Sequence, residues 1–171
     1  MKRIAVFGKP GGGKSTLSKK LSAATGLELY PLDLIEYQEN GKKVSPQQYK
    51  EAHNNLISQD SWIIEGLGSL DSFWSRIKAA DTLIYVDLPY WQHYWLTTKR
   101  LLKSPVVKPE GWPEGSSVLK GTLTSWKYLG LSPMFWTSEF LDRVKAQATD
   151  KRVFHVRSLS ELNNFIQKNV K

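Results

Sequence analysis

Residues 8 to 15 read GKPGGGKS and match the phosphate-binding P-loop pattern G-x-x-x-x-G-K-[ST]. Glycines let the backbone approach a phosphate without a Cβ in the way, and the N–H groups of such a loop form a nest for anions. In this pattern Lys14 reaches the β- and γ-phosphates of a nucleotide, and the Ser15 hydroxyl binds Mg²⁺. The sequence therefore predicts a nucleotide-phosphate site formed by Gly8, Gly11, Gly12, Gly13, Lys14 and Ser15.

The residues on either side of this loop have the order that a P-loop requires. The apolar run Ile4–Phe7 is typical of a short buried strand. Leu17, Leu21 and Ala24 then repeat at helical spacing, and Gly26 is placed to end that helix. The alternative, a glycine-rich turn whose lysine is only a surface charge, does not account for this strand–loop–helix order.

Length and composition predict a soluble globular domain. The chain has 171 residues, of which 40% are hydrophobic and 23% charged. No apolar run approaches the roughly 20 residues of a membrane span, and residues 4 to 7 are too short for a signal-peptide core. The absence of cysteine excludes disulfides and is compatible with the cytoplasm, where we expect the protein to reside. With no cysteine and three scattered histidines, a structural zinc site is not expected.

The chain is basic, with a formal net charge of +8. Residues 99 to 152 hold ten Lys or Arg against five Asp or Glu. This excess fits a site for polyphosphate, although a solvated basic surface or contact with nucleic acid would have the same composition.

Strand patterns alternate with helix patterns along the rest of the chain. Further strands are predicted at residues 27–30, 62–64, 82–86 and 153–156. Helices are predicted after the capping box Ser45–Gln48, from Asp71 as cap to Ala79, over Tyr90–Lys103, over Phe135–Val144 and after Ser158 as cap. This alternation predicts an α/β fold with a parallel sheet covered on both faces, and ligands bound beyond the carboxyl ends of the strands.

The pattern breaks down between Ser104 and about Pro133. Four prolines and four glycines interrupt it, which predicts a mobile excursion from the core.

Several segments in this order resemble the adenylate-kinase-like P-loop proteins called FlaR or "DNA topology modulation" proteins. The resemblance rests on GKPGGGKST, LYPLD, WIIEG, ADTLIYVDLP and RVFHVRSLSELNNFI, and it is weakest between Ser104 and Lys145. It implies a three-layer P-loop NTPase fold of the nucleoside-monophosphate-kinase type, with a five-stranded parallel sheet in the order 2-3-1-4-5. It also implies an acceptor-binding insertion at about 33–60 and a lid at about 104–133, within a single domain over 1–171.

The same resemblance implies roles for individual residues. Gly11 to Thr16 would carry the nucleotide phosphates, so Thr16 joins the predicted site. Asp33 stands where the family's LD motif ends, and Glu65 replaces the aspartate of WIIDG. A glutamate there still holds an Mg²⁺-bound water, so Ser15 and Glu65 are the predicted metal residues.

One departure from the family concerns arginine. Tyr90 replaces the arginine often found after DLP, and residues 91 to 140 contain only Arg100 with a few lysines. Lysine acts on a phosphate as a point charge, whereas arginine grips it with two parallel hydrogen bonds. The sequence therefore supports nucleotide binding more strongly than fast phosphoryl transfer.

Three carboxylates follow predicted strands. Asp33 is predicted to orient or deprotonate an acceptor hydroxyl, the alternative being a charge at a helix N-terminus. Glu65 is predicted to hold Mg²⁺-bound water, the alternative being a plain loop carboxylate. For Asp87 we favour a structural role, because Pro89 indicates a fixed turn.

Among the cations, Lys14, Arg100 and Arg143 are the predicted catalytic residues. Arg100 and Lys103 share a helix face and could meet the base or the triphosphate, or else form a solvated basic face. Arg143 is a similar candidate on the returning helix, and Arg76 is a weaker one. For the aromatic rings of Trp91, Trp95, Trp112, Trp126 and Trp136 we favour packing over base stacking.

The leading hypothesis is an ATP-dependent, Mg²⁺-requiring kinase of a small, nucleotide-like acceptor. A nucleotide-binding regulatory protein with weak hydrolysis is the first alternative. A nucleic-acid-associated protein is the second, although no helix-turn-helix or RNA-binding signature is present. The sequence indicates neither the acceptor nor the oligomeric state.

Overall fold

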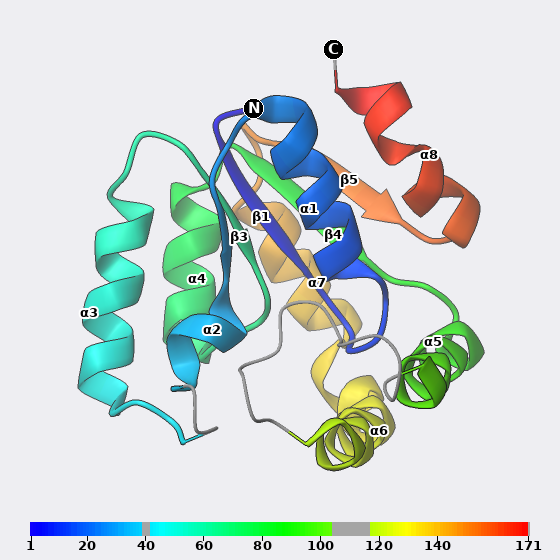
Figure 1. Ribbon diagram of the computed structural model, residues 1–171. Coiled ribbons are helices and arrows are strands. Elements are labelled where there is room, and N and C mark those ends of the chain that lie inside the picture. The colour runs from blue at the N-terminus through cyan, green and yellow to red at the C-terminus, as the bar shows by residue number, and fades with distance from the viewer. Residues whose placement is uncertain (39–41, 104–116, 171) are drawn as a thin grey trace.

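The computed structural model describes residues 1–38, 42–103 and 117–170, which form one five-stranded sheet with helices on both faces (Figure 1). All strand pairs are parallel, and the order is β2-β3-β1-β4-β5, as the family resemblance implies. The strands are β1 Arg3–Gly8, β2 Leu29–Pro31, β3 Trp62–Glu65, β4 Thr82–Val86 and β5 Arg152–Val156.

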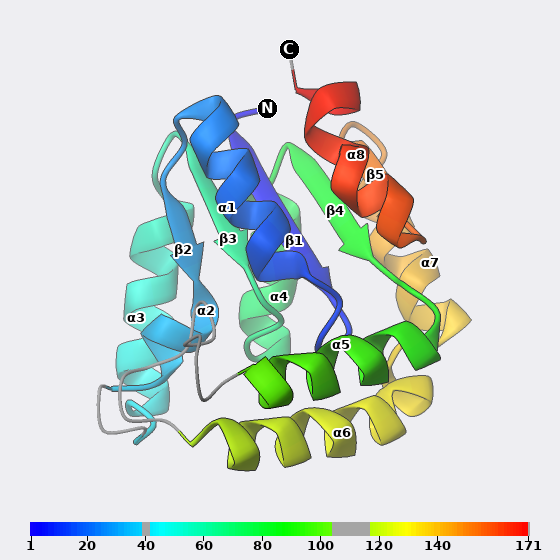
Figure 2. The ribbon, with the colours of Figure 1, turned by 45° about the vertical axis from the view of Figure 1, so that its right-hand side comes forward.

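Five helices form two layers on the faces of the sheet, and a further pair lies at one end of it. Helices α1 and α8 cover one face of the sheet, and α3, α4 and α7 cover the other (Figures 1 and 2). Helices α5 and α6 lie side by side beyond the carboxyl ends of the strands (Figure 2). The helices are α1 Lys14–Thr25, α2 Leu32–Glu36, α3 Pro46–Ile57, α4 Leu70–Ala79, α5 Tyr90–Lys103, α6 Val118–Phe135, α7 Ser138–Ala146 and α8 Leu159–Asn169.

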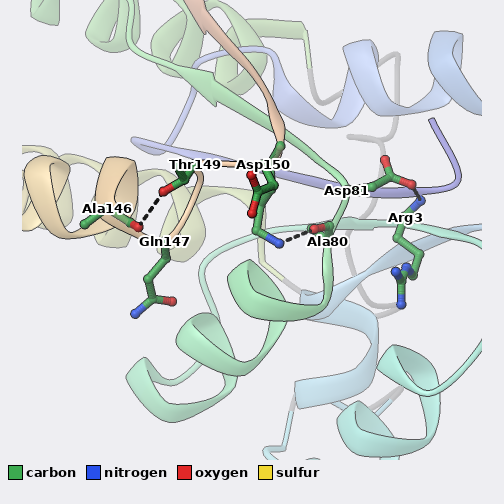
Figure 3. A pocket seen from close by; sticks show the side chains of 8 residues that line it. Arg3, Ala80, Asp81, Ala146, Gln147, Thr149 and Asp150 are labelled. Carbon is green, nitrogen blue, oxygen red and sulfur yellow. Dashed lines mark hydrogen bonds between the residues drawn. The ribbon is translucent and has the colours of Figure 1, made fainter.

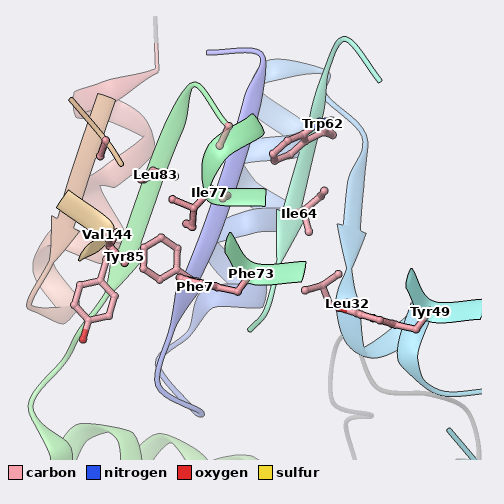
Figure 4. Close-up of a cluster of buried hydrophobic side chains, with 13 residues drawn as sticks. Phe7, Leu32, Tyr49, Trp62, Ile64, Phe73, Ile77, Leu83, Tyr85 and Val144 are labelled. Carbon is pink, nitrogen blue, oxygen red and sulfur yellow. The ribbon is translucent and has the colours of Figure 1, made fainter. Parts of the chain in front are cut away.

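The core divides along the sheet because alternate residues of a strand point to opposite faces. On β1, Ile4 and Val6 pack toward α1 and α8, while Ala5 and Phe7 pack toward α4 and α7. Figure 4 shows the second set, in which Phe7 lies against Phe73 of α4. Helices cover both faces, and the central strands are apolar over most of their length, as buried parallel strands require.

Local signals set most element ends where the sequence predicts them. Ser45 and Gln48 form both hydrogen bonds of the capping box, and Ser158 caps α8 by accepting from the Glu161 N–H. Gly26 ends α1 at a φ of 72°. The predicted cap Asp71 is wrong: Ser69 accepts the N–H of Ser72, and Asp71 lies in the first turn of α4.

Strand β2 and helix α6 differ most from the sequence prediction. β2 is a three-residue strand at Leu29–Pro31 rather than 27–30, because Leu29 is the first residue to pair with β3 and α2 follows Pro31 directly. Helix α6 runs unbroken through Gly121, Gly130 and Pro133, where an irregular excursion was predicted. The predicted lid residues 104–116 lie outside the described residues.

Tertiary packing explains why α6 forms despite its glycines and proline. Each glycine costs a helix interior only about 1 kcal/mol, and Pro133 removes one hydrogen bond in the last turn. Ser117 caps the helix, and the buried side chains on it are those of Thr122, Leu129 and Ser132. None of the described helices is long and apolar enough to cross a membrane.

Candidate functional site

The P-loop joins β1 to α1 and forms the centre of the candidate site. Gly11 has a φ of +71°, a left-handed conformation that glycine adopts without strain. A Cβ on Gly11 would lie 2.1 Å from Thr97 Oγ1, and one on Gly12 would lie 2.8 Å from His93 Cε1. Gly8 is similarly confined by the Val86 carbonyl of β4. The bare loop is therefore required by its neighbours as well as by the predicted phosphate.

Lys14 opens helix α1 and folds back over its own loop. Its Nζ donates to the Lys9 carbonyl oxygen at 2.8 Å. Burial lowers the pKa of Lys14, while the charges of Glu65 and Asp33 raise it. Lys14 thus lies within electrostatic reach of the two carboxylates that the sequence assigns to the site. Thr16, two residues further, is exposed on α1.

Ser15 and Glu65 meet at the carboxyl end of β3. The Ser15 hydroxyl donates to Glu65 Oε2 at 3.2 Å, and the β1–β3 register places Glu65 beside Val6. Glu65 is the last residue of the strand rather than a loop residue, and its side chain is buried. Burial raises the pKa of Glu65, and the nearby Lys14 charge lowers it.

The donor set around Ser15 fits Mg²⁺ bound together with phosphate oxygens. A hydroxyl and a carboxylate are hard oxygen ligands, and Mg²⁺ in such sites takes one or two carboxylates and keeps several waters. Within residues 1–38, 42–103 and 117–170, no group of three His, Cys, Asp or Glu side chains could hold a metal alone. A metal here would depend on the nucleotide for its remaining ligands.

Asp33 lies in the first turn of the five-residue helix α2, with an exposed side chain. Neighbouring protein atoms raise the pKa of the Asp33 carboxyl by desolvation, and Lys14 and Arg100 lower it. Asp33 therefore lies at a helix N-terminus and within electrostatic reach of Lys14. The first position fits a plain charge at a helix N-terminus and the second fits an acceptor-side role, the two interpretations predicted from the sequence.

The two candidate arginines have different positions. Arg100 of α5 is half-buried, and its Nη2 donates to Ser125 Oγ of α6 at 3.3 Å. Burial lowers the pKa of Arg100, and the charge of Asp33 opposes this effect. Arg143 of α7 instead lies over the Trp74 ring, 4.6 Å from its centroid. The structure thus brings Arg100 toward Lys14 and Asp33 and places Arg143 on a helix behind the sheet.

Arg76 is fully buried and faces the segment that follows Glu65. Its Nη2 donates to the carbonyls of Gly66 and Leu67 at 2.8 and 3.1 Å. Arg76 therefore fixes the backbone beyond β3.

Sequence reasoning missed an ionic chain beside the P-loop. Lys9 Nζ contacts Asp87 Oδ1, and His155 Nε2 lies 3.0 Å from Asp87 Oδ2. These contacts lower the pKa of Asp87 against the effect of burial. They support the structural role predicted for Asp87, and only the position of Asp87 after a strand signalled them in the sequence.

The tryptophans follow the packing prediction in part. Trp136 packs against Phe7 and Tyr85 in the core. Trp91 and Trp95 of α5 are 66% and 56% exposed, so packing is the wrong prediction for these two. Trp126 is half-buried in α6, and Trp112 lies outside the described residues.

A hollow of about 400 Å³ lies at the opposite, amino-terminal edge of the sheet (Figure 3). Arg3, Asp81 and Lys151 line it together with neighbouring residues. Two of the charged side chains there are engaged, since Asp81 accepts from two backbone N–H groups and Lys151 donates to two carbonyls. Parallel α/β sheets bind ligands at the other edge, where the P-loop is.

Comparisons with known proteins agree with this architecture. No protein-family model and no curated protein sequence matches the chain. Among solved structures, the chain is similar to a shikimate kinase from Acinetobacter baumannii in complex with shikimate, with a TM-score of 0.56 and 15% identity over 98% of this chain and 90% of that one. It is also similar to an unliganded sugar kinase from Janibacter sp. HTCC2649, with a TM-score of 0.49 and 16% identity over 98% and 93% of the two chains.

The likeness to the shikimate kinase establishes the fold. The parallel order 2-3-1-4-5, with GKPGGGKS between β1 and α1, is that of a P-loop NTPase of the kinase-like type. No comparison places the chain in the FlaR family that its motifs resemble.

Proposed function

We propose that the protein is an ATP-dependent phosphotransferase that acts on a small acceptor with a hydroxyl or phosphate group, expected to be nucleotide-like. The observation that carries the proposal is the meeting of Ser15 with Glu65 at 3.2 Å, next to Lys14 at the end of the P-loop. A plain anion-binding turn has no need of a buried carboxylate beside its hydroxyl.

The donor side of the proposed reaction consists of the P-loop and its first helical residues. The loop N–H groups and Lys14 would cradle the β- and γ-phosphates, and the positive end of α1 favours the same charge. Ser15 and the water-mediated reach of Glu65 would hold Mg²⁺, which neutralises charge on the transferred phosphoryl group.

Asp33 is the proposed acceptor-side residue. Its exposed carboxylate can accept a hydrogen bond from an acceptor hydroxyl, orient it and take its proton as the bond to phosphorus forms. Arg100, whose pKa burial lowers and the charge of Asp33 raises, would face the transferred or acceptor phosphate. Phosphoryl transfer needs such alignment and charge neutralisation more than covalent catalysis.

The fold comparison supports a small-molecule kinase without identifying the acceptor. The similar protein with the TM-score of 0.56 is a shikimate kinase, which shows that this architecture can carry such chemistry. The sequence identity of 15% is too low to transfer a substrate. We also propose that the protein acts in the cytoplasm and uses ATP and Mg²⁺.

The test is a panel of nucleosides, nucleotides and small hydroxyl metabolites, scored for acceptor-dependent release of ADP. With an acceptor found, Asp33→Asn should leave ATP affinity nearly intact and reduce acceptor-dependent turnover by ~10²-fold or more, as for a lost general base. Asp71→Asn is the matched control, because Asp71 is an exposed aspartate in the first turn of α4. Turnover that survives Asp33→Asn would remove Asp33 from the mechanism.

The same panel separates the alternative functions. The described parts of α5 and α6 contain a single arginine, Arg100, which favours a nucleotide-binding protein with weak hydrolysis as the second candidate. ATP binding with no acceptor that stimulates turnover would support it. DNA binding that falls steeply with salt would support the nucleic-acid alternative instead.

A further inference from the structure

Helix α5 carries three polar residues on one face, two of which lie against the P-loop. His93, Thr97 and Arg100 are spaced i, i+4 and i+7, so they share one helical face. His93 and Thr97 have no exposed surface, although the opposite face of α5 carries the exposed rings of Trp91 and Trp95. Polar groups are seldom buried in this way unless they have a partner.

The partner of His93 is the P-loop backbone. Its Nδ1 lies 2.7 Å from the Pro10 carbonyl oxygen, across 83 residues of sequence. A carbonyl oxygen only accepts, so Nδ1 must carry the proton and donate. The ring is thereby held as the Nδ1–H tautomer, while Nε2 is buried with no hydrogen-bond partner among the residues that the structure describes.

The surroundings keep this histidine neutral. Burial lowers its pKa to about 4, and the positive charges of Lys14 and Lys9 act in the same direction. Asp87 and the hydrogen bond to Pro10 oppose them. At neutral pH the ring is thus an uncharged donor that adds no cation to the phosphate site.

The loop also fits α5 closely on either side of this hydrogen bond. A Cβ on Gly11 would lie 2.9 Å from the His93 carbonyl oxygen, and one on Gly12 would lie 3.3 Å from His93 Nδ1. The loop tip therefore rests on the helix backbone and the imidazole with no side chain between them.

We propose that His93 is a positioning residue that holds the tip of the P-loop in its phosphate-binding conformation through the Nδ1–H to Pro10 hydrogen bond. In a trans peptide the C=O and the following N–H point in opposite directions. Directing the Pro10 carbonyl toward α5 therefore directs the Gly11 N–H away from α5. The inference rests on the proposed use of this loop to bind a nucleotide.

Two polar substitutions test the geometry of the hydrogen bond. His93→Asn can place an amide N–H near the Nδ1 position, whereas His93→Gln places it nearer to Nε2. We expect the asparagine variant to bind Mg·ATP within about 3-fold of wild type and the glutamine variant to bind ~10-fold more weakly, the scale of one lost hydrogen bond. Equal affinity of both variants and wild type in calorimetry would overturn the proposal.

His53→Leu is the control for a general loss of stability. His53 is also a buried histidine with a pKa lowered to about 4, but it packs on Tyr49 in α3 behind the sheet. We expect its ATP affinity to match wild type. A loss in His53→Leu equal to that in His93→Gln would show that His93 acts only through stability.

Hydrogen exchange of the free proteins separates this inference from the proposed function. The amides of residues 11–14 should exchange faster in His93→Gln than in wild type or His93→Asn, with no nucleotide present. Unchanged exchange in all three proteins would overturn the positioning role. If wild type itself bound no ATP, the proposed function would fail, while the exchange result would still decide what His93 does to the loop.

Discussion

Glu65 combines two demands that a single residue seldom meets. As the last residue of β3 it belongs to a buried strand, and as a carboxylate beside Ser15 it belongs to a polar site. Removing a carboxylate from water is costly unless it has partners, and here Ser15 and the charge of Lys14 provide them. The Ser15 hydroxyl therefore helps to stabilise the buried charge of Glu65.

Ser15→Ala should weaken ATP binding more in the presence of Mg²⁺ than in its absence. The hydroxyl would contact the metal, so its loss should affect only the complex that contains the metal. Calorimetric titrations of ATP with Mg²⁺ and with EDTA provide the measurement. Equal losses under both conditions would place Ser15 against phosphate rather than metal.

Gly11→Ala should abolish ATP binding in a protein that still folds. The new Cβ would meet Thr97 Oγ1 and the His93 carbonyl, and the φ of +71° is unfavourable for alanine by about 1–2 kcal/mol. Gly26→Ala is the control, because Gly26 has a φ of +72° and no atom within 4 Å of a Cβ. The control should lose similar backbone stability and keep its ATP affinity; a matching loss of affinity would contradict the crowding argument.

At the residue scale, the sequence predicts what local spacing determines. Lys14 and Ser15 follow from the motif because the loop and the helix start are contiguous in sequence. His93 and the chain from Lys9 through Asp87 to His155 could not be predicted, since their contacts span 68 to 83 residues. No periodicity in a single sequence specifies which buried histidine faces a loop so distant along the chain.

Among the elements, caps were predictable and tertiary packing was not. The box of Ser45 with Gln48 and the cap at Ser158 involve atoms three residues apart. Helix α6 has glycines and a proline that predict irregularity, yet its packing along α5 outweighs their local cost. Ser69 is the cap of α4 because its hydroxyl accepts the Ser72 N–H, which leaves Asp71 within the first turn of the helix.

The segment at about 104–133 is predicted to close over bound ATP. Its described part, residues 117–133, covers most of α6 and contacts α5 through Ser125 and Arg100, so closure should change the protection of these residues. Hydrogen exchange with and without a non-hydrolysable ATP analogue should show added protection over residues 117–133 and none over α4 behind the sheet. Protection unchanged over both would remove the lid.

For the whole molecule, acid sensitivity follows from two buried histidines. His53 and His93 have pKa values lowered to about 4, below the 6.5 of the unfolded chain. Because the unfolded state then binds more protons, stability falls as the pH drops from about 6.5 toward 4. A tenfold difference in proton affinity is about 1.4 kcal/mol, so the two together contribute several kcal/mol.

His53→Leu should therefore reduce this acid sensitivity. The variant has one fewer histidine to protonate on unfolding, so its free energy of unfolding should decrease less than that of wild type between pH 6.5 and 4. Urea denaturation at several pH values measures the difference. Parallel pH profiles for the two proteins would show that His53 is protonated without cost in the folded state.

The sheet as a whole was predictable in class from alternating patterns, because parallel strands buried on both faces must be short and apolar. Its strand order came from the family resemblance, since no local signal specifies which strands are neighbours. The site could be predicted where strands end, at Asp33 and Glu65. Arg143 could not be placed, because the same helical pattern allows the face toward Trp74 or toward the P-loop.

The hydrogen bond from Lys14 to the Lys9 carbonyl holds the ammonium group over its own loop before any ligand arrives. An ammonium group has three N–H donors, and this bond uses only one of them. The long side chain is therefore already ordered in the folded protein, so less side-chain entropy is left to be lost when the proposed phosphate binds.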